Sequence, residues 1–194
     1  MSGLFSMLVI MKRSHLLIAL LLLVGVIITV MCLEASNDPN KLRNKQLEFI
    51  EKTPDVELLD AIHSKLAGKD VRNFNKSETA IYLVSQFQRE SDPSYSSIYN
   101  SFTITYQDLP RAFRMIGADR HAKLAEKANR VYEKAKEKEE RENGKKEEFT
   151  YTYYPELDEF EDSLIELRKV EDLWDLQTAY IRKHKSDFVD AKVK

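Results

Sequence analysis

Cysteine is almost absent from this chain of 194 residues, because Cys32 is the only one. A single cysteine excludes a disulfide framework and a zinc site built on paired cysteines. The four histidines show no metal-ligand spacing, and the chain has no glycine-rich phosphate loop and no nucleophile elbow. We therefore predict a non-enzymatic protein with no catalytic residue, no metal site and no cofactor. His63 and His121 are interpreted as exposed helix residues.

Glycine and proline are also scarce, with five of each. Three of the glycines, Gly68, Gly117 and Gly144, stand where apolar helical patterns come to an end. This combination is typical of an all-α protein. We predict a single helical domain of about six to eight helices, because the length of the chain is typical of one domain.

Charge of one sign is not in excess, since 30 Lys and Arg residues balance 32 Asp and Glu residues. From Ser36 onward the counts are 28 and 31, a net charge near −3. A protein that binds nucleic acid directly needs a basic face. We therefore predict no direct nucleic-acid partner.

Apolar residues recur at intervals of three and four residues along most of the chain after residue 40. The pattern predicts helices near residues 42–52, 54–67, 77–90, 92–102, 109–116, 119–132, 157–167 and 173–181. Thr53-Pro54 is expected to start the second helix and Ser77 to cap the third. Residues 133–148 are interpreted as a solvated helix extension and loop. Aromatic residues at helical spacing predict a core that contains Phe74, Phe87, Phe113, Tyr132, Phe160 and Trp174.

One long run has no charge at all. It extends over 18 residues, 16–33, and includes Leu16, Leu20, Leu23, Ile27 and Leu33. A helix of this length covers roughly 27 Å, close to the thickness of the hydrocarbon core of a bilayer. Lys12 and Arg13 precede the run, so the positive-inside rule places the amino terminus in the cytoplasm and the rest outside. The sequence thus predicts a single-pass membrane protein with the lipid bilayer as a partner.

Three fates of this run stay open: a retained anchor, a cleaved signal that leaves a secreted or periplasmic protein, and a lipoprotein. The predicted organisation is a membrane anchor or signal segment at 1–35, a linker at 36–40 and a helical domain at 41–194. The oligomeric state does not follow from the sequence.

Several short motifs in the second half of the chain resemble the bacterial DNA-mimic-protein family, over about Ile81 to Val189. The motifs are Ile81-Tyr82-Leu83-Val84, Asn100-Ser101, Leu109 to Ala118, His121-Ala122-Lys123-Leu124, Tyr180 to His184 and Asp187-Phe188-Val189. The resemblance implies a helical domain. It also implies an activity, because a founding member presents carboxylates in place of DNA phosphates and blocks a DNA-binding protein. One departure is that the family's Asn-Gly-Gly-Phe turn is replaced here by residues 92–97, which contain Pro93 and no glycine.

Mimicry of DNA requires dense negative charge, and one segment has it. Between Glu156 and Asp175 nine acidic residues stand against two basic ones. The candidate acidic face consists of Asp158, Glu159, Glu161, Asp162 and Glu166. Asp158, Asp162 and Glu166 are spaced four apart, which places them on one side of a helix. The alternative interpretation is the ordinary polar side of an amphipathic helix.

Two functional hypotheses follow from these observations. The first is a membrane-tethered interaction domain on the exported side that contacts a basic protein. The second is a cytoplasmic DNA mimic that occupies the basic face of a DNA-binding protein.

Overall fold

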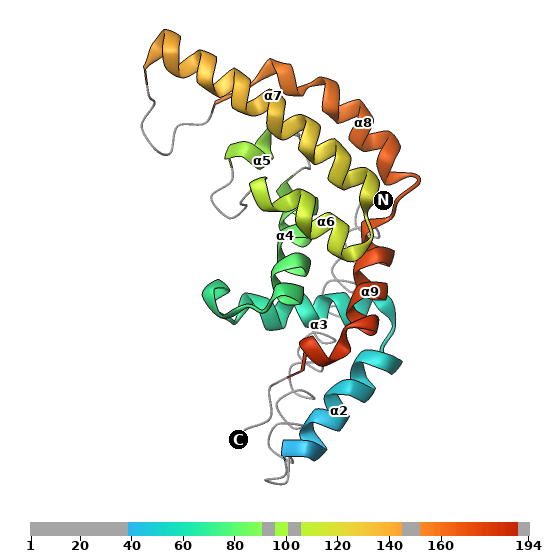
Figure 1. The fold of residues 1–194 in the computed structure, drawn as a ribbon. Helices are drawn as coiled ribbons and strands as arrows, with labels where there is room; N and C mark the ends of the chain where they lie inside the picture. Colours follow the sequence, from blue (N-terminus) through green and yellow to red (C-terminus); the bar gives the residue numbers. More distant parts are fainter. Residues whose placement is uncertain (1–38, 91–95, 101–105, 145–151, 190–194) are drawn as a thin grey trace, which may run out of the picture. The chain divides into compact units, whose positions relative to one another are not determined.

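The structure is a computed structural model that describes residues 39–90, 96–100, 106–144 and 152–189. Over these ranges it contains eight α-helices and four short 3-10 helices and no strand (Figure 1). The α-helices are α2 (Pro39–Lys52), α3 (Asp55–Ala67), α4 (Lys76–Glu90), α5 (Ser97–Asn100), α6 (Leu109–Ile116), α7 (Asp119–Asn143), α8 (Glu159–Arg168) and α9 (Leu173–Lys183). The 3-10 helices are η1 (Val71–Asn73), η2 (Tyr106–Asp108), η3 (Pro155–Leu157) and η4 (Lys185–Asp187). The all-α prediction is confirmed.

The chain divides into two compact units, Met1–Lys45 with Ala191–Lys194, and Gln46–Asp190. The second unit holds the hydrophobic core, which runs from Ile50 to Val189. The predicted domain boundaries at residues 35 and 40 stay a prediction.

The predicted localisation requires a correction. Among the residues that the structure describes, no helix is both long enough and apolar enough to cross a membrane. This finding contradicts the prediction of a single-pass membrane protein. The run from Leu16 to Leu33, on which that prediction rested, lies outside the described residues, as does the family's turn region at 92–95.

The core of the second unit is built around α6. This helix packs against α4 on one side and α7 on the other, and α7 in turn packs along α8 (Figure 1). Phe113 of α6 is completely buried, and its ring meets that of Phe87 from α4 edge to face at 4.9 Å. Edge-to-face contact is a preferred geometry for aromatic rings.

Four of the six predicted core aromatics are buried, namely Phe87, Phe113, Tyr132 and Phe160, and Phe74 is partly buried. The prediction for Trp174 is wrong, because its side chain is 47% exposed. It lies in the first turn of α9, where Leu173 and Gln177, four residues apart, take the inward face.

The glycines end helices as predicted, because Gly68, Gly117 and Gly144 follow α3, α6 and α7. Gly117 has φ +86°, which a side chain rarely tolerates. Its N–H donates to the Arg114 carbonyl at 3.1 Å, and the Ala118 N–H donates to the Phe113 carbonyl at 2.8 Å. These two bonds form a Schellman motif. They reverse the chain so that α7 starts immediately after α6.

The predicted cap of α4 is wrong by two residues. Asn75 caps this helix, with its side-chain oxygen accepting from the Glu78 N–H while Glu78 accepts from the Asn75 N–H, both at 2.9 Å. This reciprocal arrangement is a capping box. Ser77 is buried instead. Its hydroxyl donates to the carboxylate of Asp187, which belongs to η4, at a distance of 2.6 Å.

Candidate functional site

The acidic face lies on α8 and on the residue that precedes it. Leu157, Phe160 and Leu164 are buried, and α8 packs on α7. Because these apolar residues recur every three or four positions, they occupy one side of the helix and leave four of the five carboxylates on the other, with Glu161 at the boundary. Asp158, Glu159, Asp162 and Glu166 are exposed, whereas Glu161 is partly buried. The structure therefore brings the five predicted residues together on one short segment.

At least three of these carboxylates, Asp158, Glu161 and Glu166, have interaction partners. The Tyr153 hydroxyl donates to Asp158, and Lys169 forms an ion pair with Glu166 at 2.5 Å. Both members of the Lys169–Glu166 pair are mostly exposed, so solvent screens this interaction strongly. Within the described part of the chain, Glu159 and Asp162 form no ion pair. The negative charge of the acidic face is thus only partly offset.

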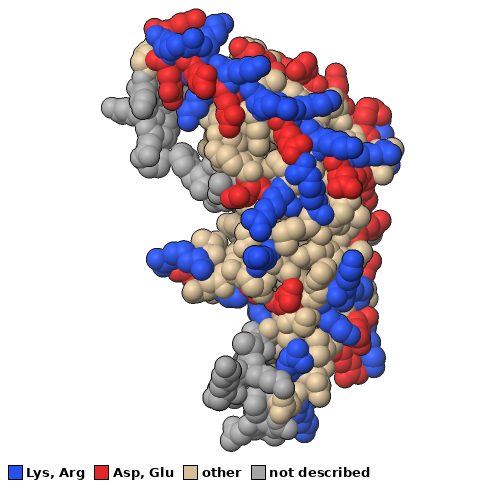
Figure 2. All heavy atoms as spheres, in the orientation of Figure 1, with Lys and Arg blue, Asp and Glu red and all other residues tan. Residues whose placement is uncertain are grey.

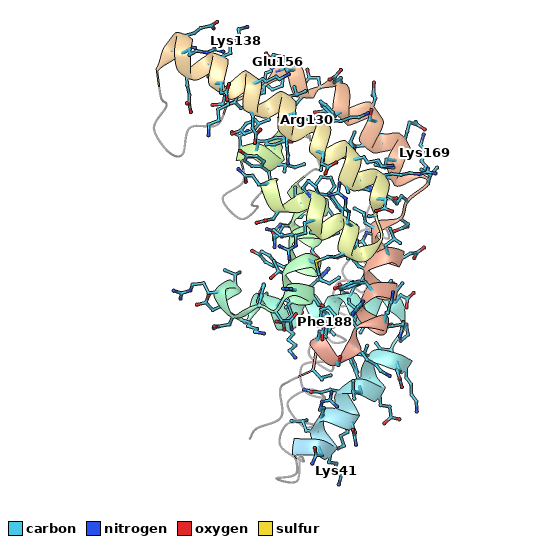
Figure 3. The ribbon with its side chains drawn as sticks, viewed as in Figure 1. Lys41, Arg130, Lys138, Glu156, Lys169 and Phe188 are labelled. Atoms are coloured by element: carbon cyan, nitrogen blue, oxygen red, sulfur yellow. The ribbon has the colours of Figure 1, made fainter. Side chains whose placement is uncertain are left out.

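A basic stripe on α7 was not predicted. Its members are exposed and are spaced three or four residues apart, which places them in one row: Lys123, Lys127, Arg130, Lys134, Lys138 and Arg141. Figure 2 shows blue side chains along α7 and red side chains at the edge formed by α8, and Figure 3 labels Arg130 and Lys138 on α7. The spacing of these basic residues can be read from the sequence, but acidic residues are interspersed among them, so the row is not evident until the helix is known. Helices α7 and α8 therefore present rows of opposite charge.

The chain that enters α8 is held by Asn100 of α5. The side-chain amide of Asn100 donates to the Thr152 carbonyl, and its oxygen accepts from the Thr152 N–H, both at 2.9 Å. A single side chain thereby satisfies both backbone groups of one residue, as a neighbouring strand would do. Asn100 belongs to one of the motifs that carry the family resemblance.

The chain that leaves α8 is held by Glu171. Its carboxylate accepts from the backbone N–H groups of Arg120 and His121 at 3.2 and 2.9 Å, and from Nδ1 of His121 at 2.6 Å. These N–H groups belong to the first turn of α7, which leaves them without partners inside the helix. Glu171 therefore caps α7 from a position 50 residues further along the chain.

His121 is buried, with 1% of its surface exposed, so its predicted exposure is wrong. Its ring lies beside those of Phe87 and Phe113, and within the described residues Nε2 has no hydrogen-bond partner. Because Nδ1 donates to a carboxylate, the neutral ring leaves Nε2 as an acceptor. Protonation would place a second N–H donor in apolar surroundings. Burial accordingly lowers the pKa of His121, although the hydrogen bond and charge of Glu171 act to raise it.

The pKa values of two further groups, His63 and Glu171, also lie below their ordinary values. Burial lowers the pKa of His63, against the opposing effects of Asp60 and Gln177. For Glu171, burial acts to raise the pKa, but the donors of His121 and Arg120 outweigh it, so the pKa lies below its ordinary value.

The stability of the domain should decrease as the pH falls from 7.5 to 5. A histidine whose pKa is lower in the folded state takes up its proton first in the unfolded state, near the ordinary value of 6.5, and this favours unfolding. Glu171 contributes only below about 4.5. His121→Asn retains a donor near Nδ1 without a titrating ring, so it should reduce the dependence of unfolding free energy on pH. Adding His63→Gln should reduce it further. Urea unfolding at several pH values measures this slope, and an unchanged slope in the double variant would contradict the assignment.

One further polar motif residue, Arg182, joins two parts of the helical scaffold. Arg182 of α9 donates to the carbonyls of Ile50, Glu51 and Thr53 at 2.6, 3.0 and 2.8 Å, and also to Asp55. These acceptors lie at the end of α2 and the start of α3. Asn100, His121 and Arg182 of the family motifs thus make contacts between distant parts of the fold, whereas the acidic face lies outside those motifs.

Within the part of the chain that the structure describes, no group of three or more His, Cys, Asp and Glu side chains is arranged to hold a metal ion.

Comparison with known proteins gives one match. The family model of the DMP19-like protein matches residues 72–184, more than half of the chain. The searches of curated proteins and of solved structures found no match. The matched range includes the Asn100, His121 and Arg182 motifs described above. The chain therefore belongs to the DMP19-like protein family.

Proposed function

We propose that this domain is a non-enzymatic DNA mimic that occupies the basic, DNA-binding face of a protein partner. Membership of the DMP19-like family supports the proposal, and the acidic face on α8 is the observation that carries it. From Asp158 to Glu166 the helix advances about 12 Å. The four exposed carboxylates over that length correspond to about one charge per 4 Å, close to the roughly 3.4 Å per phosphate along one DNA strand.

The basic stripe on α7 makes this surface different from a uniform polyanion. A partner that docks on α8 also meets the field of Lys127, Arg130 and Lys134 on the neighbouring helix. Charge patterns of this kind determine orientation and specificity more than they determine affinity. The surface should therefore bind a partner whose basic groove docks in one defined orientation better than it binds a simple polycation.

Charge reversal on the acidic face should weaken the activity strongly. In the triple variant Asp158→Lys, Asp162→Lys and Glu166→Lys, displacement of labelled duplex DNA from the captured DNA-binding partner should require at least about tenfold more protein, because the opposed charges become like charges. Fluorescence anisotropy of the DNA measures displacement directly.

A matched control changes the net charge by the same amount elsewhere. Glu57→Lys, Asp108→Lys and Glu133→Lys reverse three exposed carboxylates outside α8, and this variant should displace DNA nearly as well as the unaltered protein. Equal losses in the two variants would show that net charge alone matters, and would contradict the proposal. Failure of the unaltered protein to displace DNA from any captured partner would contradict it as well.

A further inference from the structure

Three apolar side chains are exposed where α8 passes into α9. Ile165 is 52% exposed, Val170 is 63% exposed and Trp174 is 47% exposed. We call these three residues the apolar corner. They fall within ten consecutive residues of the α8–α9 segment. Several large apolar groups exposed on one segment mark an interaction site more often than scattered single ones do.

The border of the apolar corner is mainly acidic. Two exposed cations, Arg168 and Lys169, follow Ile165 by three and four residues, but the carboxylates of this segment outnumber them. Ile165 follows Glu161 by four residues and Asp162 by three, so on the helix surface it lies beside both. Asp172 and Asp175, both exposed, flank Trp174 along the chain. The acidic face and the apolar corner therefore adjoin at Ile165 on α8, and the apolar corner continues along the chain to the first turn of α9.

Local structure holds Trp174 at the surface. The carboxylate of Asp172 accepts from the Trp174 N–H at 2.7 Å and thereby caps α9. The ring has one described aromatic neighbour, His63 of α3, with the centroids 6.5 Å apart and the planes tilted by 56°. Such a contact leaves much of the indole open to solvent. Trp174 is also the only tryptophan in the chain.

We propose that the apolar corner is the anchor of the binding surface and that its occupant is a basic protein helix which carries apolar side chains. This inference rests on the proposed function and adds the class of partner to it. Protein interfaces combine an apolar centre, in which tryptophan contributes strongly, with a charged rim. Carboxylates around a tryptophan match an amphipathic segment with lysine or arginine beside leucine-like residues. A polycation without apolar groups can interact with the charged rim but not with the apolar corner.

Two synthetic peptides of equal length and equal lysine content test this. One is an amphipathic Lys/Leu helix, and in the other serine replaces every leucine. The unaltered protein should bind the Lys/Leu peptide at least about tenfold more tightly, the order expected for one interface hot spot. Trp174→Ala should remove most of that difference and leave the affinity for the Lys/Ser peptide unchanged. Val71→Ala, at an exposed apolar residue on η1, should preserve the difference.

Trp174 fluorescence gives an independent signal. The Lys/Leu peptide should shift its emission to shorter wavelength and protect it from acrylamide, whereas the Lys/Ser peptide should do neither. Thermal unfolding of Trp174→Ala, compared with the unaltered protein, separates lost binding from lost folding.

The outcomes distinguish the two proposals. Equal affinity of the unaltered protein for both peptides, or a difference that survives in a folded Trp174→Ala variant, would overturn the apolar anchor alone. Absence of binding by both peptides would overturn the anchor together with the acidic surface on which it depends.

Discussion

Replacement of Phe113 by alanine should lower the free energy of unfolding by about 4 kcal/mol, the middle of the range for a buried phenylalanine. The side chain is completely buried at the centre of α6, between α4 and α7. The substitution removes the edge-to-face contact with Phe87 and the contact with the ring of His121. It also leaves a cavity that the surrounding helices fill only in part. Urea unfolding followed by circular dichroism measures the loss.

The corresponding decrease in melting temperature is roughly 8 to 16 °C for a domain of this size. Val71→Ala serves as the control, because its exposed side chain should contribute less than about 0.5 kcal/mol. A loss below about 2 kcal/mol for Phe113→Ala would show that α6 does not lie at the centre of the core.

Replacement of Arg182 by alanine should lower the free energy of unfolding by about 2 to 3 kcal/mol. Its guanidinium donates to three backbone carbonyls between Ile50 and Thr53 and to Asp55. Hydrogen bonds that involve a charged donor are stronger than neutral ones, and their loss leaves the carbonyls unsatisfied. The same unfolding measurement applies.

Arg182→Lys separates geometry from charge. A lysine keeps the positive charge but has no planar fork of donors, so it should recover less than half of the loss. Lys183→Ala, the exposed neighbour, should have little effect. Full recovery by lysine would mean that the charge, and not the array of hydrogen bonds, joins α9 to the α2–α3 turn.

The helices could be predicted from the sequence because their signals are local. Gly117 ends α6 and Asp119 starts α7 where the pattern places them. The thirteen-residue helix α3 follows the same rule, with Leu59, Ile62 and Leu66 on its buried side. In each of these cases the residues that decide the structure are neighbours in the chain.

The interactions that position the acidic face could not be predicted in this way. Glu171 and His121 are 50 residues apart, and Asn100 and Thr152 are 52 residues apart. A polar residue that interacts with a distant helix looks in sequence like any surface residue, which is why the sequence predicts an exposed His121. The sequence also predicts a buried Trp174, because helical spacing alone does not show which side of α9 faces inward.

The two attachments of the acidic helix have a consequence for how a partner is captured. Asn100 holds the chain just before α8, and Glu171 holds it just after. A surface fixed at both ends loses little conformational entropy on association, so docking resembles the meeting of two rigid bodies. Long-range electrostatic attraction then determines the association rate constant. Added salt should therefore lower the association rate constant more than it raises the dissociation rate constant.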